Sequence, residues 1–295
     1  MGVGSILLWS TTIAFLRSIS EKNGALDTAV FNMLLSGIFL FLIQFIVYKR
    51  TLFNRLKSLP LSYFYKVAIF MIIHMSLLYS AVGNAKTREA VVVVGIINYL
   101  WPGFTFLFSV PILKNKARYS LLISGIIIAF SGTVAAMLEG NRLSLTSISH
   151  SLKSDIQPFL FTLGGAAAWA IYSNMTRKYT IKDDVTATPV IFLITALFLT
   201  LIMLLKGEVP ALHIQGKQYL ELAYLVIFTT SAAYVFWDRA MKKGNKNLVA
   251  ALSYGIPPLS TLTSCLYLGV KIGFGLVAAA ILVVIGAILC RYSIK

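Results

Sequence analysis

The amino-acid sequence predicts an all-α integral membrane protein: ten transmembrane helices arranged as two inverted five-helix repeats, with both termini cytoplasmic. Three observations predict this class. The 295-residue chain is 58% hydrophobic and only 12% charged, its apolar stretches recur from end to end, and its second half resembles its first. A soluble domain of this length needs far more polar surface. We therefore expect the chain to fold in a lipid bilayer.

Ten stretches are apolar and long enough to span a bilayer, since about 20 helical residues cross about 30 Å of hydrocarbon. The predicted spans are 2–18, 28–48, 61–83, 90–112, 118–137, 157–176, 186–205, 218–238, 246–268 and 272–290. Residues 1–137 form the first repeat, 138–156 a connecting periplasmic loop, and 157–295 the second repeat. No basic segment precedes the first span, so we interpret it as a retained helix and not as a signal peptide.

The positions of the basic residues predict the orientation. A net charge of +16 fits a nucleic-acid partner or basic residues that anchor spans at the cytoplasmic face. With the N-terminus inside, most Lys and Arg residues fall in inward segments such as 49–57, 114–118, 177–182 and 239–246. The expected partners are thus the lipid bilayer and a small-molecule substrate, with no nucleic acid; the oligomeric state stays open, and a monomer is compatible with ten spans.

An internal repeat sets the predicted architecture. Residues 98–102, with the sequence NYLWP, align with residues 253–257, SYGIP, and Trp9 aligns with Trp169. Five spans per half force the two halves to cross the membrane in opposite senses, an arrangement common among secondary transporters. The repeat therefore predicts transport by alternating access.

Prolines at matching positions mark candidate gates. Pro102 lies in the fourth span, and Pro257 and Pro258 lie in the ninth. Each proline removes a backbone donor and frees a carbonyl one turn earlier, which is tolerated beside protein or a water-filled cavity. We expect these helices to be broken at the substrate site and to gate it; packing bends alone are the alternative.

Aromatic and polar residues at mid-membrane depth are the candidate substrate-binding residues. His74 lies well inside the third span, and Asn98, Trp101 and Thr105 are spaced to share one helical face. Two tryptophans lie inside their spans and not at the interface, where tryptophans usually gather. For any single ring, ordinary packing explains its position equally well. The full candidate set is Trp9, His74, Asn98, Trp101, Trp169, Tyr172, Tyr234, Trp237 and Tyr254.

The chemistry that the sequence lacks also limits the function. Glu89, Glu221 and Asp238 fall at span ends and the other carboxylates in loops, so we expect no membrane-centre acid to act as a proton or sodium relay. Neither a phosphate-binding loop nor a metal-ligand cluster is present, and no second catalytic group pairs with His74. We expect no catalytic residue, no metal and no cofactor.

Short motifs then indicate a family. Leu8-Trp9-Ser10 and Ala168-Trp169-Ala170, within two inverted halves, resemble the drug/metabolite transporter superfamily of the EamA type. Residues 94–102, 169–172, 234–237 and 253–254 resemble the YddG-type aromatic amino-acid exporters of bacteria. That resemblance implies a central cavity lined by spans one, three, four, six, eight and nine. It also implies aromatic amino acids as substrates, and cavity positions at His74, Trp101, Trp169 and Tyr254.

We therefore predict a secondary transporter of the bacterial inner membrane that exports a small amphipathic metabolite, with aromatic amino acids as the leading substrates. S-adenosylmethionine or another amino acid is the alternative substrate. An integral-membrane enzyme or a non-transporting subunit is a more remote alternative.

Overall fold

The computed structural model describes residues 1–141, 144–179, 187–260, 262 and 274–294. Within these ranges the chain is helical, with no β-strand and a single isolated bridge between Ala117 and Ile294. The helices of the first half are α1 (Gly2–Asn23), α2 (Ala25–Tyr48), α3 (Thr51–Lys57), α4 (Leu61–Tyr63), η1 (Phe64–Ala68), α5 (Ile69–Asn84), α6 (Arg88–Asn98), α7 (Trp101–Leu113) and α8 (Tyr119–Asn141). They are followed by α9 (Leu145–Ser154), α10 (Gln157–Lys178), α11 (Thr188–Leu205), α12 (Gln218–Tyr224), η2 (Leu225–Ala232), α13 (Ala233–Lys243), α14 (Lys246–Ser253) and α16 (Phe274–Ser293).

Seven helical stretches in the described residues are long and apolar enough to cross a membrane. They are Ala25–Tyr48, Leu61–Asn84, Ala90–Leu113, Tyr119–Glu139, Thr188–Leu205, Gln218–Lys243 and Phe274–Ser293. The predicted first and sixth spans are α1 and α10, helices of 22 residues each that carry more polar side chains. The predicted ninth span begins with α14, and most of its second half, from residue 261, lies outside the described residues.

The predicted helix breaks are present at equivalent points of the two halves. Helix α6 ends at Asn98 and α7 begins at Trp101; α14 ends at Ser253 and residues 256–260 are again helical. The prolines begin the second helix of each pair, where a missing N–H costs no hydrogen bond. The break corrects one expectation: Asn98 and Trp101 belong to different helices and do not share one continuous helical face.

Two further features recur in both halves. Thr87 and Asn245 accept hydrogen bonds from the backbone N–H of Ala90 and Leu248, at 3.1 Å each, and so cap α6 and α14. The long helices Leu61–Asn84 and Gln218–Lys243 each contain a π-helical stretch, η1 and η2. Such widened turns occur frequently at functional sites.

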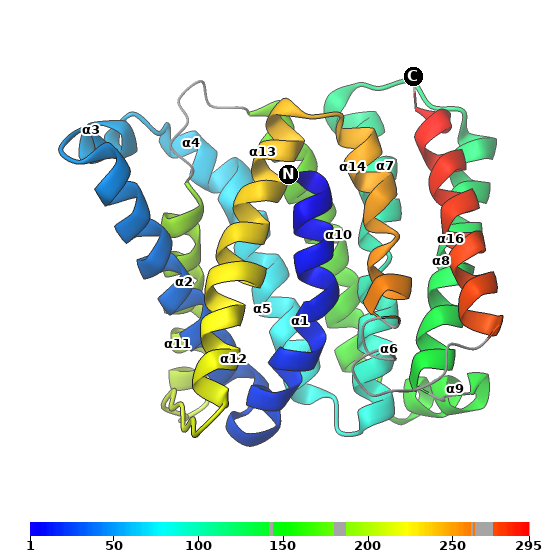
Figure 1. Cartoon of the computed structure of the whole chain (residues 1–295), viewed down its shortest axis with the longest axis horizontal. Coiled ribbons are helices and arrows are strands. Elements are labelled where there is room, and N and C mark those ends of the chain that lie inside the picture. Colours follow the sequence, from blue (N-terminus) through cyan, green and yellow to red (C-terminus); the bar gives the residue numbers. More distant parts are fainter. Residues whose placement is uncertain (142–143, 180–186, 261, 263–273, 295) are drawn as a thin grey trace.

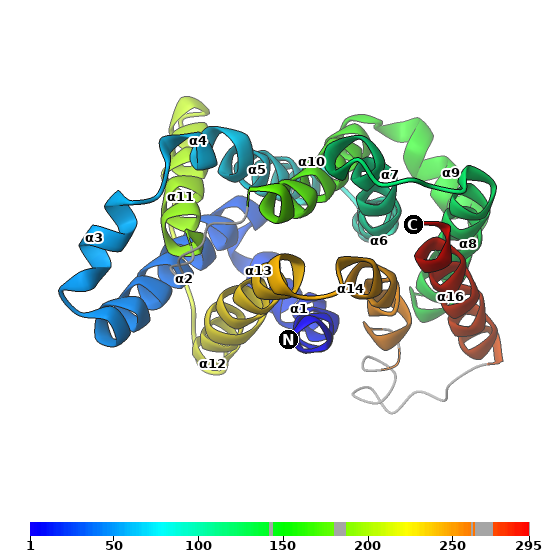
Figure 2. The same ribbon diagram turned by 90° about the horizontal axis from the view of Figure 1, so that it is seen from above.

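The helices form a bundle with both termini toward the same end (Figure 1). Seen from above, α5, α10 and α7 lie on one side, and α13, α1 and α14 lie on the other (Figure 2). Helices α8 and α16 pair closely through glycines. A Cβ atom on Gly286 would lie 2.6 Å from the carbonyl oxygen of Gly125, so only a residue without a side chain permits this approach.

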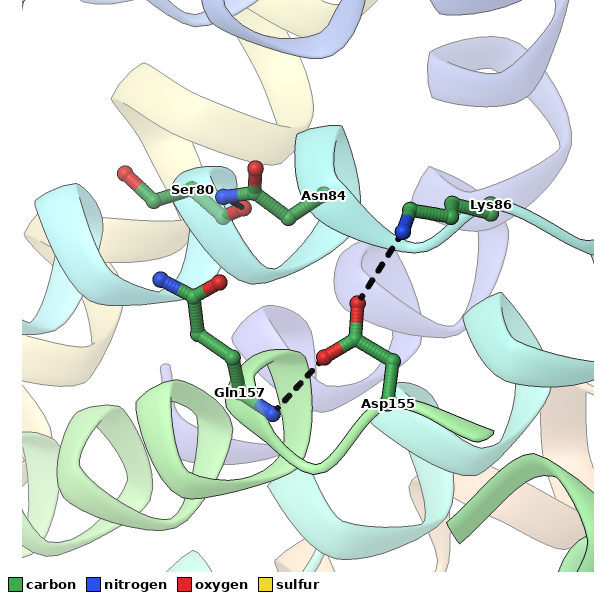
Figure 3. Close-up of polar contacts among 5 residues, drawn as sticks. All are labelled: Ser80, Asn84, Lys86, Asp155 and Gln157. Carbon is green, nitrogen blue, oxygen red and sulfur yellow. Dashed lines mark hydrogen bonds and ion pairs between the residues drawn. The ribbon is translucent and has the colours of Figure 1, made fainter. Parts of the chain in front are cut away.

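The segment predicted as a connecting loop is partly helical, because α8 extends to Asn141 and α9 follows. Its last residues precede α10, which begins at the end of the bundle opposite the termini (Figure 1), and they contact both halves of the chain (Figure 3). Asp155 accepts a hydrogen bond from the backbone N–H of Gln157 at 3.1 Å and lies 3.7 Å from the ammonium group of Lys86. Because the Lys86 side chain is 83% exposed, this ion pair contributes little to the free energy of unfolding.

Candidate functional site

All four tryptophans of the chain meet in one cluster at the centre of the bundle. Trp9 comes from α1, Trp101 from α7, Trp169 from α10 and Trp237 from α13. Each ring contacts the other three, with the six centroid separations between 5.2 and 6.5 Å. Trp101, Trp169 and Trp237 are buried and Trp9 is half-buried. The tryptophan cluster thus joins helices from both halves of the chain.

Trp169 is the hub of a wider aromatic site. Its ring lies 5.4 Å from Tyr172, 5.4 Å from Tyr234 and 5.1 Å from the imidazole of His74, measured between ring centroids. Phe192 of α11 extends the site by contacting Tyr234 at 5.4 Å. Sequence reasoning did not select Phe192, because it lies in one of the most apolar helices and resembles any lipid-facing or packing residue there.

Hydrogen bonds fix the orientation of three of these side chains. The indole N–H of Trp9 donates to the carbonyl of Thr229 at 3.1 Å, and the indole N–H of Trp237 donates to the hydroxyl of Ser173 at 3.2 Å. Nδ1 of His74 lies 2.9 Å from the carbonyl of Gly165. Because both indole N–H groups are already bonded, Trp9 and Trp237 offer mainly flat apolar faces to a ligand.

Two predicted site residues lie apart from the tryptophan cluster. Tyr254 is buried at the break after α14 among Phe106, Leu122 and Cys290, and its hydroxyl lies where a Cβ of Gly103 would be only 2.7 Å away. Asn98 ends α6, and its side-chain amide oxygen Oδ1 is buried and without a hydrogen-bond partner among the described residues. The structure therefore places these two residues at the helix breaks, together with Pro102, Pro257 and Pro258.

A buried carboxylate, which the sequence reasoning placed at a span end, lies beside the site. Asp238 is in α13, which continues to Lys243, and is only 1% exposed. Tyr172 donates to it at 2.8 Å and Thr188 at 3.2 Å, and the Lys242 ammonium lies 3.7 Å away. The helix runs five residues beyond the predicted span, to Lys243, so Asp238 is helical and buried near the span end where the sequence placed it. The expectation that no acid at the membrane centre acts as a relay stays a prediction. The Asp-x-x-x-Lys spacing was the available signal.

The site is rich in ring faces and poor in groups that could hold a metal ion. Among the described residues, no three His, Cys, Asp or Glu side chains are grouped to hold a metal ion. Indole and phenol faces attract other rings through edge-to-face and offset contacts, and attract cations through the ring quadrupole. The chemistry of these faces is thus of a kind that suits an aromatic or cationic group.

The sequence is similar to those of known membrane transporters. The sequence profile of the EamA-like transporter family matches residues 1–138 and again 157–292. Two relatives, each named aromatic amino acid exporter YddG, come from Salmonella typhimurium and Escherichia coli (strain K12). Each is 27% identical over 290 residues, covering 98% of this chain and 95% of its own.

A solved crystal structure superposes on this chain with a TM-score of 0.77 at 24% identity, over 98% of this chain and 95% of the other. At this identity the similarity is evidence for a shared fold and not for a shared function. The family consists of membrane transporters and not of enzymes. The chain is a multi-pass membrane protein that belongs to the EamA-like transporter family, within the drug/metabolite transporter superfamily.

Proposed function

We propose that this chain is a secondary transporter that exports aromatic amino acids across a bacterial inner membrane, with the tryptophan cluster as its substrate site. The cluster itself carries the proposal. Four indoles from four helices meet in the interior, and they are all the tryptophans that the chain has. Interior packing alone does not require that every tryptophan gather at one point. The names of the two YddG relatives support the same substrate class.

The proposed architecture is ten transmembrane helices in two inverted halves, residues 1–137 and 157–295, with both termini cytoplasmic. The helix contacts support it, because they pair as a two-fold relation requires. Helix α1 contacts α13 and α14, and its counterpart α10 contacts their counterparts α5 and α6. Counterparts also contact each other directly, α2 with α11 and α8 with α16. The twofold match of the family profile supports the same division.

The ring separations mean that a substrate site here must open to admit a ligand. A substrate ring inserted between two others needs about 7 to 8 Å between them, twice the van der Waals separation of carbon atoms. The tryptophan rings are 5.2 to 6.5 Å apart, so an aromatic ligand enters by separating the helices that carry them. Ring-to-ring contacts are then exchanged for ring-to-ligand contacts of the same kind, which keeps the cost of opening low. The breaks at Pro102 and at Pro257 and Pro258 are the proposed gates for this rocking.

Counterflow into proteoliposomes tests the proposal. Purified protein in vesicles preloaded with unlabelled substrate should accumulate radiolabelled phenylalanine and tryptophan above empty liposomes. S-adenosylmethionine and lysine are the comparison solutes, because a purine also stacks on indole whereas lysine has no ring. A signal from S-adenosylmethionine alone would keep a transporter and overturn the substrate. Accumulation of none of the four would contradict the proposed function.

A further inference from the structure

A buried ion pair lies against the aromatic site and is absent from the function proposed above. The side chains of Asp238 and Lys242 are 2% and 12% exposed, with Oδ2 and Nζ 3.7 Å apart. Tyr172 of α10 and Thr188 of α11 donate to the two carboxylate oxygens. The carboxylate is therefore held by three helices, α10, α11 and α13.

Burying two charges has a cost that a structural role does not easily justify. Removing an ion pair from water is expensive, and an apolar pair of similar volume often stabilises a protein equally well. Inside membrane helices, charged residues are rare and usually mark a substrate or ion pathway. The location of this pair, directly after Trp237 on α13, therefore points to a ligand.

Tyr172 shows how a ligand can reach both sites at once. Its ring lies 5.4 Å from that of Trp169, and its hydroxyl lies 2.8 Å from Asp238. One aromatic side chain thus spans the distance from the tryptophan cluster to the carboxylate. An aromatic amino acid has the same construction, a ring with a polar head, and its head carries one positive and one negative charge.

The cation is held in place by its own surroundings. The Lys242 ammonium lies 5.9 Å from the centre of the Tyr63 ring, and Arg177 of α10 donates to the main-chain carbonyl oxygen of Lys242. Arg177 thus fixes the turn of α13 that carries Lys242. Both members of the pair have defined positions beside the cluster.

We propose that Asp238 and Lys242 form the head-group subsite of the transporter: Asp238 binds the α-ammonium and Lys242 the α-carboxylate of a zwitterionic amino acid. In the closed structure the two side chains neutralise each other. On opening, the substrate separates them and supplies each with a new counter-charge. Opening without substrate leaves two charges with weaker partners, so the pair also opposes opening of the unloaded site. This inference rests on the proposed function.

Competition against labelled tryptophan in the counterflow assay tests the two charges separately. Tryptamine lacks the carboxylate, and indole-3-propionate lacks the ammonium. Asp238→Asn should lower the apparent affinity for tryptophan and for tryptamine by about tenfold or more, which corresponds to one charge-assisted hydrogen bond. The apparent affinity for indole-3-propionate should not change. Lys242→Met should lower the apparent affinity for tryptophan and for indole-3-propionate, and the apparent affinity for tryptamine should not change. Equal losses for all three compounds would overturn the subsite.

The double variant Asp238→Asn/Lys242→Met gives a decision that depends on no analogue. If the pair is only structural, removing both charges should restore the tryptophan transport that each single change lowers. If it binds the head group, tryptophan transport should stay low in the double variant, while Asp238→Glu and Lys242→Arg keep most of it. Restoration in the double variant, or equal loss in the charge-conserving ones, refutes the inference. Wild-type protein that transports no aromatic amino acid refutes the proposed function instead.

Discussion

Trp169 provides the sharpest test of the tryptophan cluster, because its ring contacts those of Trp9, Trp101 and Trp237 as well as two tyrosines and His74. Truncation to alanine would leave a cavity costing about 3 to 5 kcal/mol and would confound binding with folding. We therefore compare Trp169→Phe, which keeps an aromatic ring, with Trp169→Leu, whose side chain has no ring and a volume close to that of phenylalanine. The difference between the two variants isolates the aromatic contribution to substrate binding.

The expected size follows from the ring contacts. One aromatic pair contributes about 0.5 to 1.5 kcal/mol beyond its buried area, so losing one ring-to-substrate contact should weaken tryptophan binding about 2- to 13-fold. The assay is the half-saturating tryptophan concentration in counterflow, with Tm in detergent as the folding check. Phe198→Leu is the matched control, because that ring in α11 is 46% exposed. Equal half-saturation for the Phe and Leu variants, with similar Tm, would refute an aromatic binding role for Trp169.

Three further predictions concern His74, the glycine seam and a helix cap. His74→Ala should lower aromatic amino-acid transport with normal membrane expression, because the ring contacts Trp169; loss of expression would make its role structural. Gly286→Val should lower Tm by several degrees, because the valine side chain would overlap the backbone of α8. Val277→Leu is the control, since Val277 of α16 is 48% exposed and its replacement should leave Tm unchanged. Equal Tm values for the two variants would contradict the close pairing of α8 and α16. Asn245→Ala should cost about 1 kcal/mol of stability by removing the cap of α14, and Asn245→Asp should retain it; equal unfolding midpoints would exclude the cap.

The membrane class and the helix breaks were predictable from the sequence because they depend on local properties. Apolar stretches of sufficient length have few alternatives to spanning a bilayer, since every backbone polar group must be paired within the segment. Pro102 and Pro257 cannot donate a hydrogen bond within a helix, so the breaks beside them follow from single residues. Trp9 and Trp169 were predicted to lie in the interior because their sequence positions are in the middle of their spans and not at the ends.

What only the tertiary structure decided is which side chains share the site. Periodicity places a residue on one face of its own helix and says nothing about which helix opposes that face. The gathering of Trp101 and Trp237 with Trp9 and Trp169 therefore required the packed bundle, as did the placement of Tyr254 beside Gly103. The burial of Asp238 was decided in the same way, because hydropathy only places this residue at a span end. The partners that make its burial tolerable are Tyr172, Thr188 and Lys242. A charge can be buried only when its partners arrive from other helices, and those partners are fixed by the fold.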